Sequence, residues 1–134
     1  MDTSDYGPLS EPPSDLASTI LSAMTDEERS NLLDLLDRLQ DWHESVSENR
    51  GLLFHPEARA ALWGTALARM ADHFREIGQN QRALFLMGAA WNISKYPVFA
   101  FNAALLCLSC SDLSRARSLF EDYLFTYQNV LRTL

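Results

Sequence analysis

The sequence predicts an all-α protein, a short α-solenoid of about two helix pairs with an N-terminal capping helix. Apolar residues recur at spacings of three and four along most of the chain, which is typical of amphipathic helices. No segment alternates apolar and polar residues as a half-buried strand does. One pattern also occurs twice, at an offset of about 33 residues, which is close to the size of one helix–turn–helix unit.

The repeated pattern consists of five positions that pair small with small and core with core residues. Small residues allow two helices to cross closely, and large residues fill the remaining space. The first copy holds Ala71, Phe74, Gly78, Ala83 and Met87, and the second holds Ala104, Cys107, Ser111, Ala116 and Phe120.

The N-terminal residues 1–24 are expected to form an acidic, Pro-rich, disordered tail that contains one short helix. Residues 1–13 combine Pro, Gly and acidic side chains, a composition that cannot bury a core. Ser14 is a suitable N-cap for the short helix. That helix would carry its apolar side chains on one face: Leu16, Ile20, Leu21 and Met24.

The helical domain is expected to span residues 25–134, and its first long helix covers residues 26–46. Thr25 and Glu28 have the spacing of a capping box, in which each side chain bonds the backbone of the other residue. One apolar stripe follows, made of Leu32, Leu35, Leu36, Leu39, Trp42 and Val46. Solenoids normally need at least three repeats, so this helix should cap the first unit, or a second protomer should complete the core.

The first unit is predicted as a helix from Pro56 to about Ile77, a turn at Gly78 and a helix from residue 80 or 81 to near Pro97. Pro suits the first turn of a helix, and Gly suits the position after its end. The second unit is predicted as helices over residues 98–110 and from about 114 toward 131, joined by a turn at residues 111–112.

The two units resemble tetratricopeptide (TPR) repeats. The second unit matches that family at Asn102, Ala104, Leu113, Ala116 and Phe120, and the first at Ala71, Phe74, Gly78, Ala83, Ala90 and Pro97. Cys107 stands where the family has an aromatic residue, and Ser111 where it has Gly. The second unit also resembles the last repeat of type III secretion chaperones for translocator proteins, through its Pro-Val-Phe start, small-residue-rich helix and Ser-Asp turn.

The resemblance implies a protein-binding adaptor or secretion-type chaperone, since the first helix of each TPR unit lines the concave face. The implied partner-binding residues are Val98, Phe101, Asn102, Leu105 and Leu108, with Arg69 and Arg75 on the rim. Such a face suits a peptide or helix segment with apolar anchors. Alternatively, the C-terminal helix or a dimer mate covers these apolar residues.

A second hypothesis is a structural or regulatory subunit that forms a homodimer or joins a larger assembly. Its interface would be the stripe Leu32–Val46, chiefly Leu32, Leu35, Leu36, Leu39 and Trp42. The same residues serve as the capping interface under the first hypothesis.

Charge and length exclude several classes of partner. Residues 1–50 hold twelve acidic and three basic side chains, and residues 51–134 hold six acidic and eight basic, for a net charge of −7. An acidic chain without a Lys/Arg cluster repels phosphate backbones, so we expect no nucleic-acid binding. No apolar run reaches the roughly 18–20 residues of a membrane span. With two Cys and no secretory signal, we expect a cytoplasmic protein.

The residues that could carry chemistry do not assemble into a recognisable site. Cys107 and Cys110 form a CxxC at a helix C-terminus, where redox pairs do not lie, and zinc would need two further ligands. His43, His55 and His73 share no metal-binding spacing. We expect no enzyme, no cofactor and no metal.

Overall fold

The computed structural model describes residues 12–46 and 56–132, which form six α-helices. Their bounds are α1 Asp15–Ser22, α2 Asp26–Val46, α3 Pro56–Glu76, α4 Asn80–Ser94, α5 Pro97–Ser109 and α6 Leu113–Arg132. The described residues contain no strand, so the all-α prediction is confirmed. The tail expected over residues 1–13 lies almost entirely outside the described residues, as does His55.

The two hairpins α3–α4 and α5–α6 repeat each other at the offset seen in the sequence. Helix α3 ends at Glu76, and α5 ends one repeat length later at Ser109. Helix α4 begins at Asn80, and α6 begins one repeat length later at Leu113. The fold is therefore built from two equivalent helix pairs.

The two hairpin turns use the same backbone geometry. Gly78 and Ser111 both have positive φ, 82° and 60°, in the left-handed region that ends many helices. The hydrogen bonds that close each turn also correspond. The amide of Gln79 donates to the carbonyl of Phe74 at 2.8 Å, and that of Asp112 donates to the carbonyl of Cys107 at 2.9 Å.

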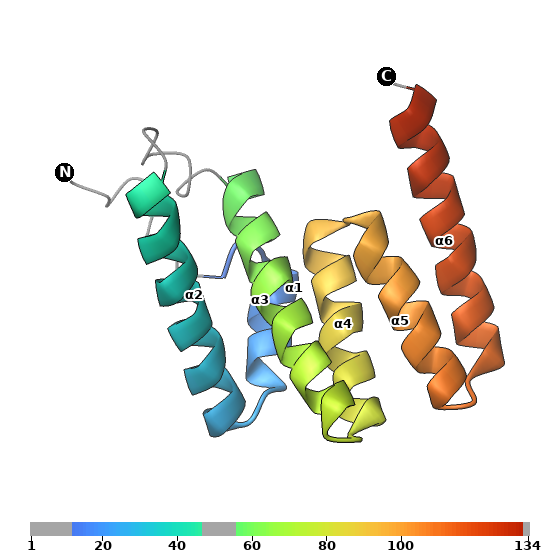
Figure 1. Cartoon of the computed structure of the whole chain (residues 1–134), viewed down its shortest axis with the longest axis horizontal. Helices are drawn as coiled ribbons and strands as arrows, with labels where there is room; N and C mark the ends of the chain where they lie inside the picture. Colours follow the sequence, from blue (N-terminus) through green and yellow to red (C-terminus); the bar gives the residue numbers. More distant parts are fainter. Residues whose placement is uncertain (1–11, 47–55, 133–134) are drawn as a thin grey trace.

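The helices form two layers, with α2, α3 and α5 in one and α1, α4 and α6 in the other. Helix α2 packs on α3, α1 packs on α4, and α4 packs on both α3 and α5. In Figure 1, helices α2 to α6 follow one another across the molecule in chain order, with α1 behind α3. Helix α4 is the central element, and residues Ala83, Leu84, Leu86, Met87, Gly88, Ala89, Ala90 and Trp91 are all buried.

Helices α1 and α2 cap the first hairpin from opposite layers. The Ser14 hydroxyl caps α1 by accepting the amide of Ala17 at 3.2 Å. Helix α2 buries Leu32 and Leu36 completely, and Leu35 and Leu39 pack half-buried against the same core. Leu32 and Leu36 are thus buried within the chain itself and are not accessible to a second protomer, whereas Trp42 remains exposed.

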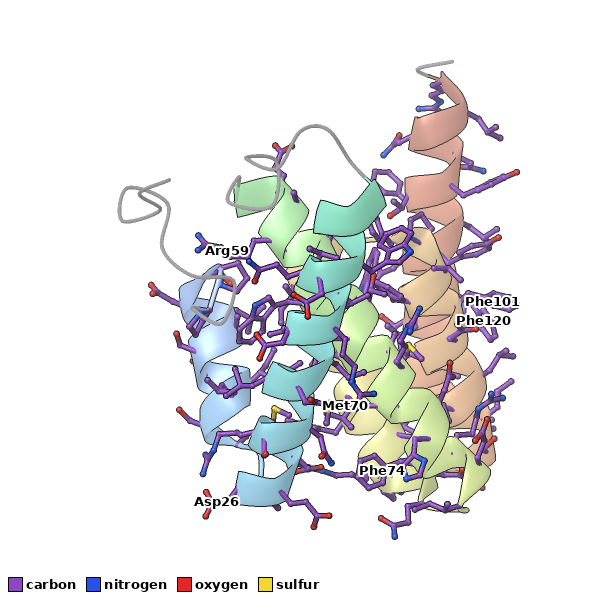
Figure 2. All side chains as sticks on the ribbon, turned by 60° about the vertical axis from the view of Figure 1, so that its left-hand side comes forward. Asp26, Arg59, Met70, Phe74, Phe101 and Phe120 are labelled. Atoms are coloured by element: carbon purple, nitrogen blue, oxygen red, sulfur yellow. The ribbon has the colours of Figure 1, made fainter. Side chains whose placement is uncertain are left out.

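Small residues at the helix crossings set how closely the hairpins pack. Ala71, Ala83, Ala104 and Ala116, the small members of the repeated pattern, are all buried. Gly64 of α3 allows α4 to approach closely, because a Cβ there would lie 2.3 Å from the Ser94 hydroxyl. At the opposite end of the molecule from α2, the rings of Phe101 and Phe120 meet where α5 packs on α6 (Figure 2).

Candidate functional site

The layer formed by α2, α3 and α5 carries two grooves, one on each side of α3. A groove of about 810 Å³ lies between α2 and α3, and one of about 290 Å³ lies between α3 and α5. We call them the α2–α3 groove and the α3–α5 groove. Helix α3 is the ridge that separates them.

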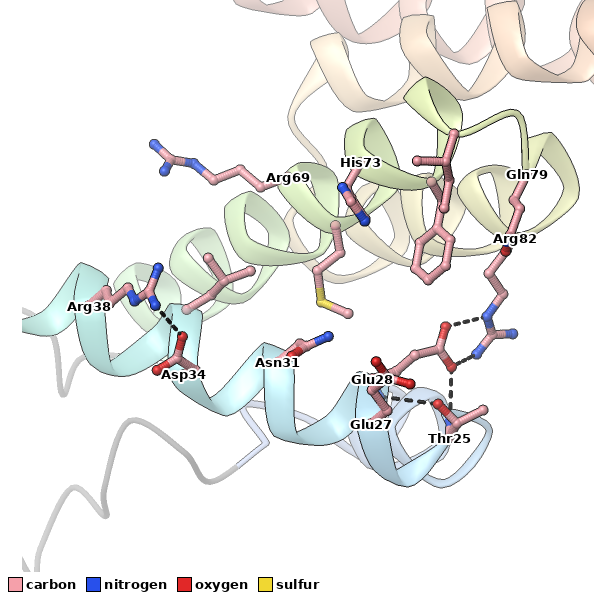
Figure 3. A pocket seen from close by; sticks show the side chains of 14 residues that line it. Thr25, Glu27, Glu28, Asn31, Asp34, Arg38, Arg69, His73, Gln79 and Arg82 are labelled. Atoms are coloured by element: carbon pink, nitrogen blue, oxygen red, sulfur yellow. Dashed lines mark hydrogen bonds and ion pairs between the residues drawn. The ribbon is translucent and has the colours of Figure 1, made fainter.

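The α2–α3 groove has an apolar floor and rims of both charges. The floor consists of the side chains of Leu35, Met70, Phe74 and Ile77. The rims carry Glu27 and Asp34 from α2 and Arg69 and His73 from α3, as the close-up in Figure 3 shows. Ile77 is more than half exposed, so the floor is open at the end of α3.

One end of this groove is closed by the capping box of Thr25 and Glu28, to which the Arg82 side chain also binds. The amide of Thr25 donates to the Glu28 carboxylate at 2.9 Å, and the amide of Glu28 donates to the Thr25 hydroxyl at 3.1 Å. The predicted capping box is therefore confirmed. The guanidinium of Arg82, from α4, donates to both oxygens of the same carboxylate (Figure 3).

This pair is charged and held in place from several sides. The hydrogen bond from Arg82 lowers the pKa of Glu28 below its usual value, although burial acts in the opposite direction. The Arg82 pKa is raised by the same hydrogen bond. The guanidinium also lies 4.5 Å from the centre of the Phe85 ring. Both oxygens of the Glu28 carboxylate accept hydrogen bonds, so we interpret the pair as a clamp between α2 and α4.

The α3–α5 groove contains the predicted partner-binding residues Asn102 and Leu105, together with Ser109 of α5. Asp72 and Arg75 of α3 form the opposite wall, where the guanidinium of Arg75 lies 3.6 Å from the Asp72 carboxylate. Buried Met87 and Leu106 form the floor. The groove thus pairs an apolar side chain with polar groups that can accept and donate hydrogen bonds.

Four of the predicted residues form an outward row on α5, which we call the α5 row: Val98, Phe101, Leu105 and Leu108. Val98, Leu105 and Leu108 keep 53%, 44% and 45% of their surface exposed. Phe101 leans on α6, with its ring centre 5.7 Å from that of Phe120 and 5.2 Å from that of Tyr123. Within the described chain, α6 covers part of Phe101 and leaves the rest of the row open.

The two predicted rim arginines lie in different grooves. Arg75 shares the α3–α5 groove with Asn102 and Leu105, whereas Arg69 lines the α2–α3 groove. The sequence interpretation did not include the apolar floor of the α2–α3 groove. No signal in the repeat pattern could have located that floor, because it depends on which side of α3 receives α2.

Within residues 12–46 and 56–132, no group of three or more His, Cys, Asp or Glu side chains could hold a metal ion. Cys107 is buried in the core, and burial raises the pKa of its thiol. His73 packs with its ring centre 5.9 Å from that of Phe74.

None of the helices in the described parts of the chain is long and apolar enough to cross a membrane. Comparison of the chain with protein-family models, with curated proteins and with solved structures finds no match.

Proposed function

We propose that this protein is a cytoplasmic, TPR-like protein-binding module, a small adaptor or chaperone that holds a segment of another protein along α5. The observation that carries the proposal is the α5 row, whose leucines and valine face solvent beside the α3–α5 groove. Contiguous exposed apolar residues with a polar border are typical of interaction sites. The charges of Arg75 and Asp72 supply that border.

The groove favours a peptide over a small-molecule ligand. Its volume of about 290 Å³ is at the lower limit of small-molecule sites, which run from about 300 to 1,000 Å³. It has room for one large apolar side chain of a bound segment, with Leu105 as its wall. Asn102 and Arg75 would then bond the polar groups of that segment. An amphipathic helix with apolar residues three and four apart matches the spacing of the α5 row.

The resemblance to secretion chaperones makes an exported protein the first class of partner to test. Such a partner keeps an apolar segment that needs shielding before export. The α5 row would provide the shield, since its exposed side chains are spaced as one face of a helix.

The experiment replaces Leu105 by a photo-crosslinking amino acid, with the same replacement at Leu33 as the control. Leu33 lies on α2, outside both grooves, and its exposure of 38% is close to the 44% of Leu105. A partner captured from native extract only through position 105 is then purified, and its affinity for the wild type and variants is measured by calorimetry.

Leu105→Glu should weaken binding of that partner by about 2 kcal/mol, the scale of an anchor residue. Leu33→Glu should leave the affinity unchanged, and circular dichroism should show equal helix content in both variants. Equal affinity of the two variants, or equal capture from both positions, would show that the α5 row is not the binding site.

A further inference from the structure

Helix α6 carries an apolar seam with the spacing of a coiled coil. Six positions alternate between steps of four and three residues: Leu113, Arg117, Phe120, Leu124, Tyr127 and Leu131. Five of the six are apolar or aromatic, and four of these are exposed by 47% or more. A repeat of about 3.5 residues keeps one face of a helix turned toward a partner helix along its whole length.

The internal repeat indicates that this α6 seam corresponds to a surface that is covered elsewhere in the chain. Phe120 and Leu124 are equivalent to Met87 and Trp91 of α4, one repeat length earlier. Helix α5 packs on α4, and Met87 and Trp91 are only 1% and 7% exposed. In the second hairpin no described helix takes the place that α5 takes in the first.

The seam is extended sideways by aromatic residues that already contact one another. Phe101 of α5 packs on Phe120 and Tyr123, and the rings of Tyr123 and Tyr127 stack with their centres 5.9 Å apart. Figure 2 shows Phe101 and Phe120 at the edge of the molecule. These aromatic side chains therefore need little reordering before another helix can pack on them, which reduces the entropic cost of binding.

The charge of the α5–α6 hairpin favours a second copy of the same chain as the partner that covers the α6 seam. Residues 97–132 hold three basic and three acidic side chains, whereas residues 1–50 hold three basic and twelve acidic. Two copies of this chain, which has a net charge of −7, would repel each other if they met through the acidic half. They can approach through α6 without such repulsion between the contacting ends.

We propose that two copies of this chain form a homodimer through antiparallel pairing of their α6 seams. In that arrangement Leu113 of one copy faces Leu131 of the other, and Phe120 faces Leu124 across a two-fold axis. Each surface meets its own copy, as in most soluble dimers. This interface lies beyond the α3–α5 groove, shares only Phe101 with the α5 row, and does not depend on the proposed function.

Arg117 selects the antiparallel orientation. Parallel pairing in register would place the two Arg117 side chains at the same level, where like charges repel. Antiparallel pairing places Arg117 opposite the Tyr127 ring, a favourable partner for a cation. The Arg117 guanidinium also lies 3.1 Å from the Glu121 carboxylate of its own helix, in an exposed pair that solvent screens and that leaves Arg117 charged.

The test measures the mass of the full chain in solution by sedimentation and by light scattering from about 1 to 100 μM, which detects micromolar dissociation constants. The wild type should be a dimer, and Leu124→Glu should be a monomer with unchanged helix content. Leu33→Glu, which changes a comparably exposed leucine on α2, should remain a dimer. A monomeric wild type across this range, or a dimeric Leu124→Glu, would overturn the proposal.

Two further variants test the geometry of the pairing. Arg117→Leu completes the seam and should tighten the dimer at least about tenfold, because a polar residue at such a position lowers stability. In a Cys110→Ser background, a mixture of Leu113→Cys and Leu131→Cys chains should crosslink mainly as the mixed pair under mild oxidation. Crosslinks mainly between identical chains would show parallel pairing instead.

The proposed dimer interface and the proposed binding groove can be tested independently. Leu105→Glu changes the α3–α5 groove and should leave the dimer mass unchanged. Leu124→Glu should leave the affinity for a captured groove partner unchanged. If Leu105→Glu alone dissociates the dimer, the seam is not the interface and the inference is wrong.

Discussion

The clamp between Glu28 and Arg82 gives the sharpest test of how the capping helices are held. Glu28→Gln keeps the size of the side chain and one acceptor for the Thr25 amide, but it removes the negative charge that Arg82 pairs with. A hydrogen bond to a charged group contributes about 1.5–3 kcal/mol. Glu28 is 5% exposed and the Arg82 side chain 28%, so solvent screens the pair only in part. We therefore expect the free energy of unfolding to fall by about 2 kcal/mol at pH 7.

The effect should depend on pH with a defined sign. The pKa of Glu28 is lower in the folded chain than its ordinary value of 4.5, so folding favours the charged carboxylate. The stabilisation is fully present above pH 4.5 and is lost as the pH falls through the lowered pKa of the folded state. The difference between the wild type and Glu28→Gln should therefore shrink below pH 4.5.

Urea unfolding followed by circular dichroism, repeated from pH 7 to pH 3, measures this difference. The matched control is Asp34→Asn, which removes the charge from a solvent-exposed pair with Arg38 at 2.9 Å. Exposed pairs between helix residues four apart contribute about 0.3–0.5 kcal/mol, so the control should change little. If Glu28→Gln costs no more than Asp34→Asn at pH 7, or costs the same at every pH, the clamp does not stabilise the fold.

The glycines and their equivalents give two further predictions, each checked by the midpoint of thermal or urea unfolding. Gly64→Ala should lower the free energy of unfolding by about 1–3 kcal/mol, because the added Cβ would overlap Ser94. Gly88→Ala should leave the stability of the fold unchanged or raise it, since its Cβ would touch only the flexible end of the Arg115 side chain. If Gly64→Ala and Gly88→Ala lowered the stability equally, α3 and α4 would not cross closely at Gly64. Gly78→Ala should cost about 1 kcal/mol at its positive φ, while Ser111→Gly should gain a few tenths. A stabilising Gly78→Ala would show that the two turns are not equivalent.

The repeat could be predicted from sequence because its causes are local. A left-handed residue at the end of a helix requires Gly or tolerates a small polar residue, and Gly78 and Ser111 stand one repeat length apart. The capping box of Thr25 and Glu28 is equally local, since both partners lie within one turn. Such features require particular residue types at a fixed spacing, and that spacing can be read directly from the sequence.

The clamp and the two grooves could not be predicted because they depend on helices far apart in sequence. Arg82 is 54 residues from Glu28, and nothing near either residue indicates the other. Arg69 and Arg75 were expected on one rim, but they are six residues apart, which turns a helix by about 240°. They consequently point to different sides of α3, one into the α2–α3 groove and the other into the α3–α5 groove.

The central position of α4 has a consequence for how this protein loses its structure. Chains of stacked repeats often melt stepwise, because each repeat touches only its neighbours. Here one buried helix is shared by α1, α3 and α5, so neither hairpin can open without exposing the same side chains to water. Denaturation should therefore be cooperative, with the amide protons of α4 exchanging only when the entire molecule unfolds and those near the end of α6 exchanging first.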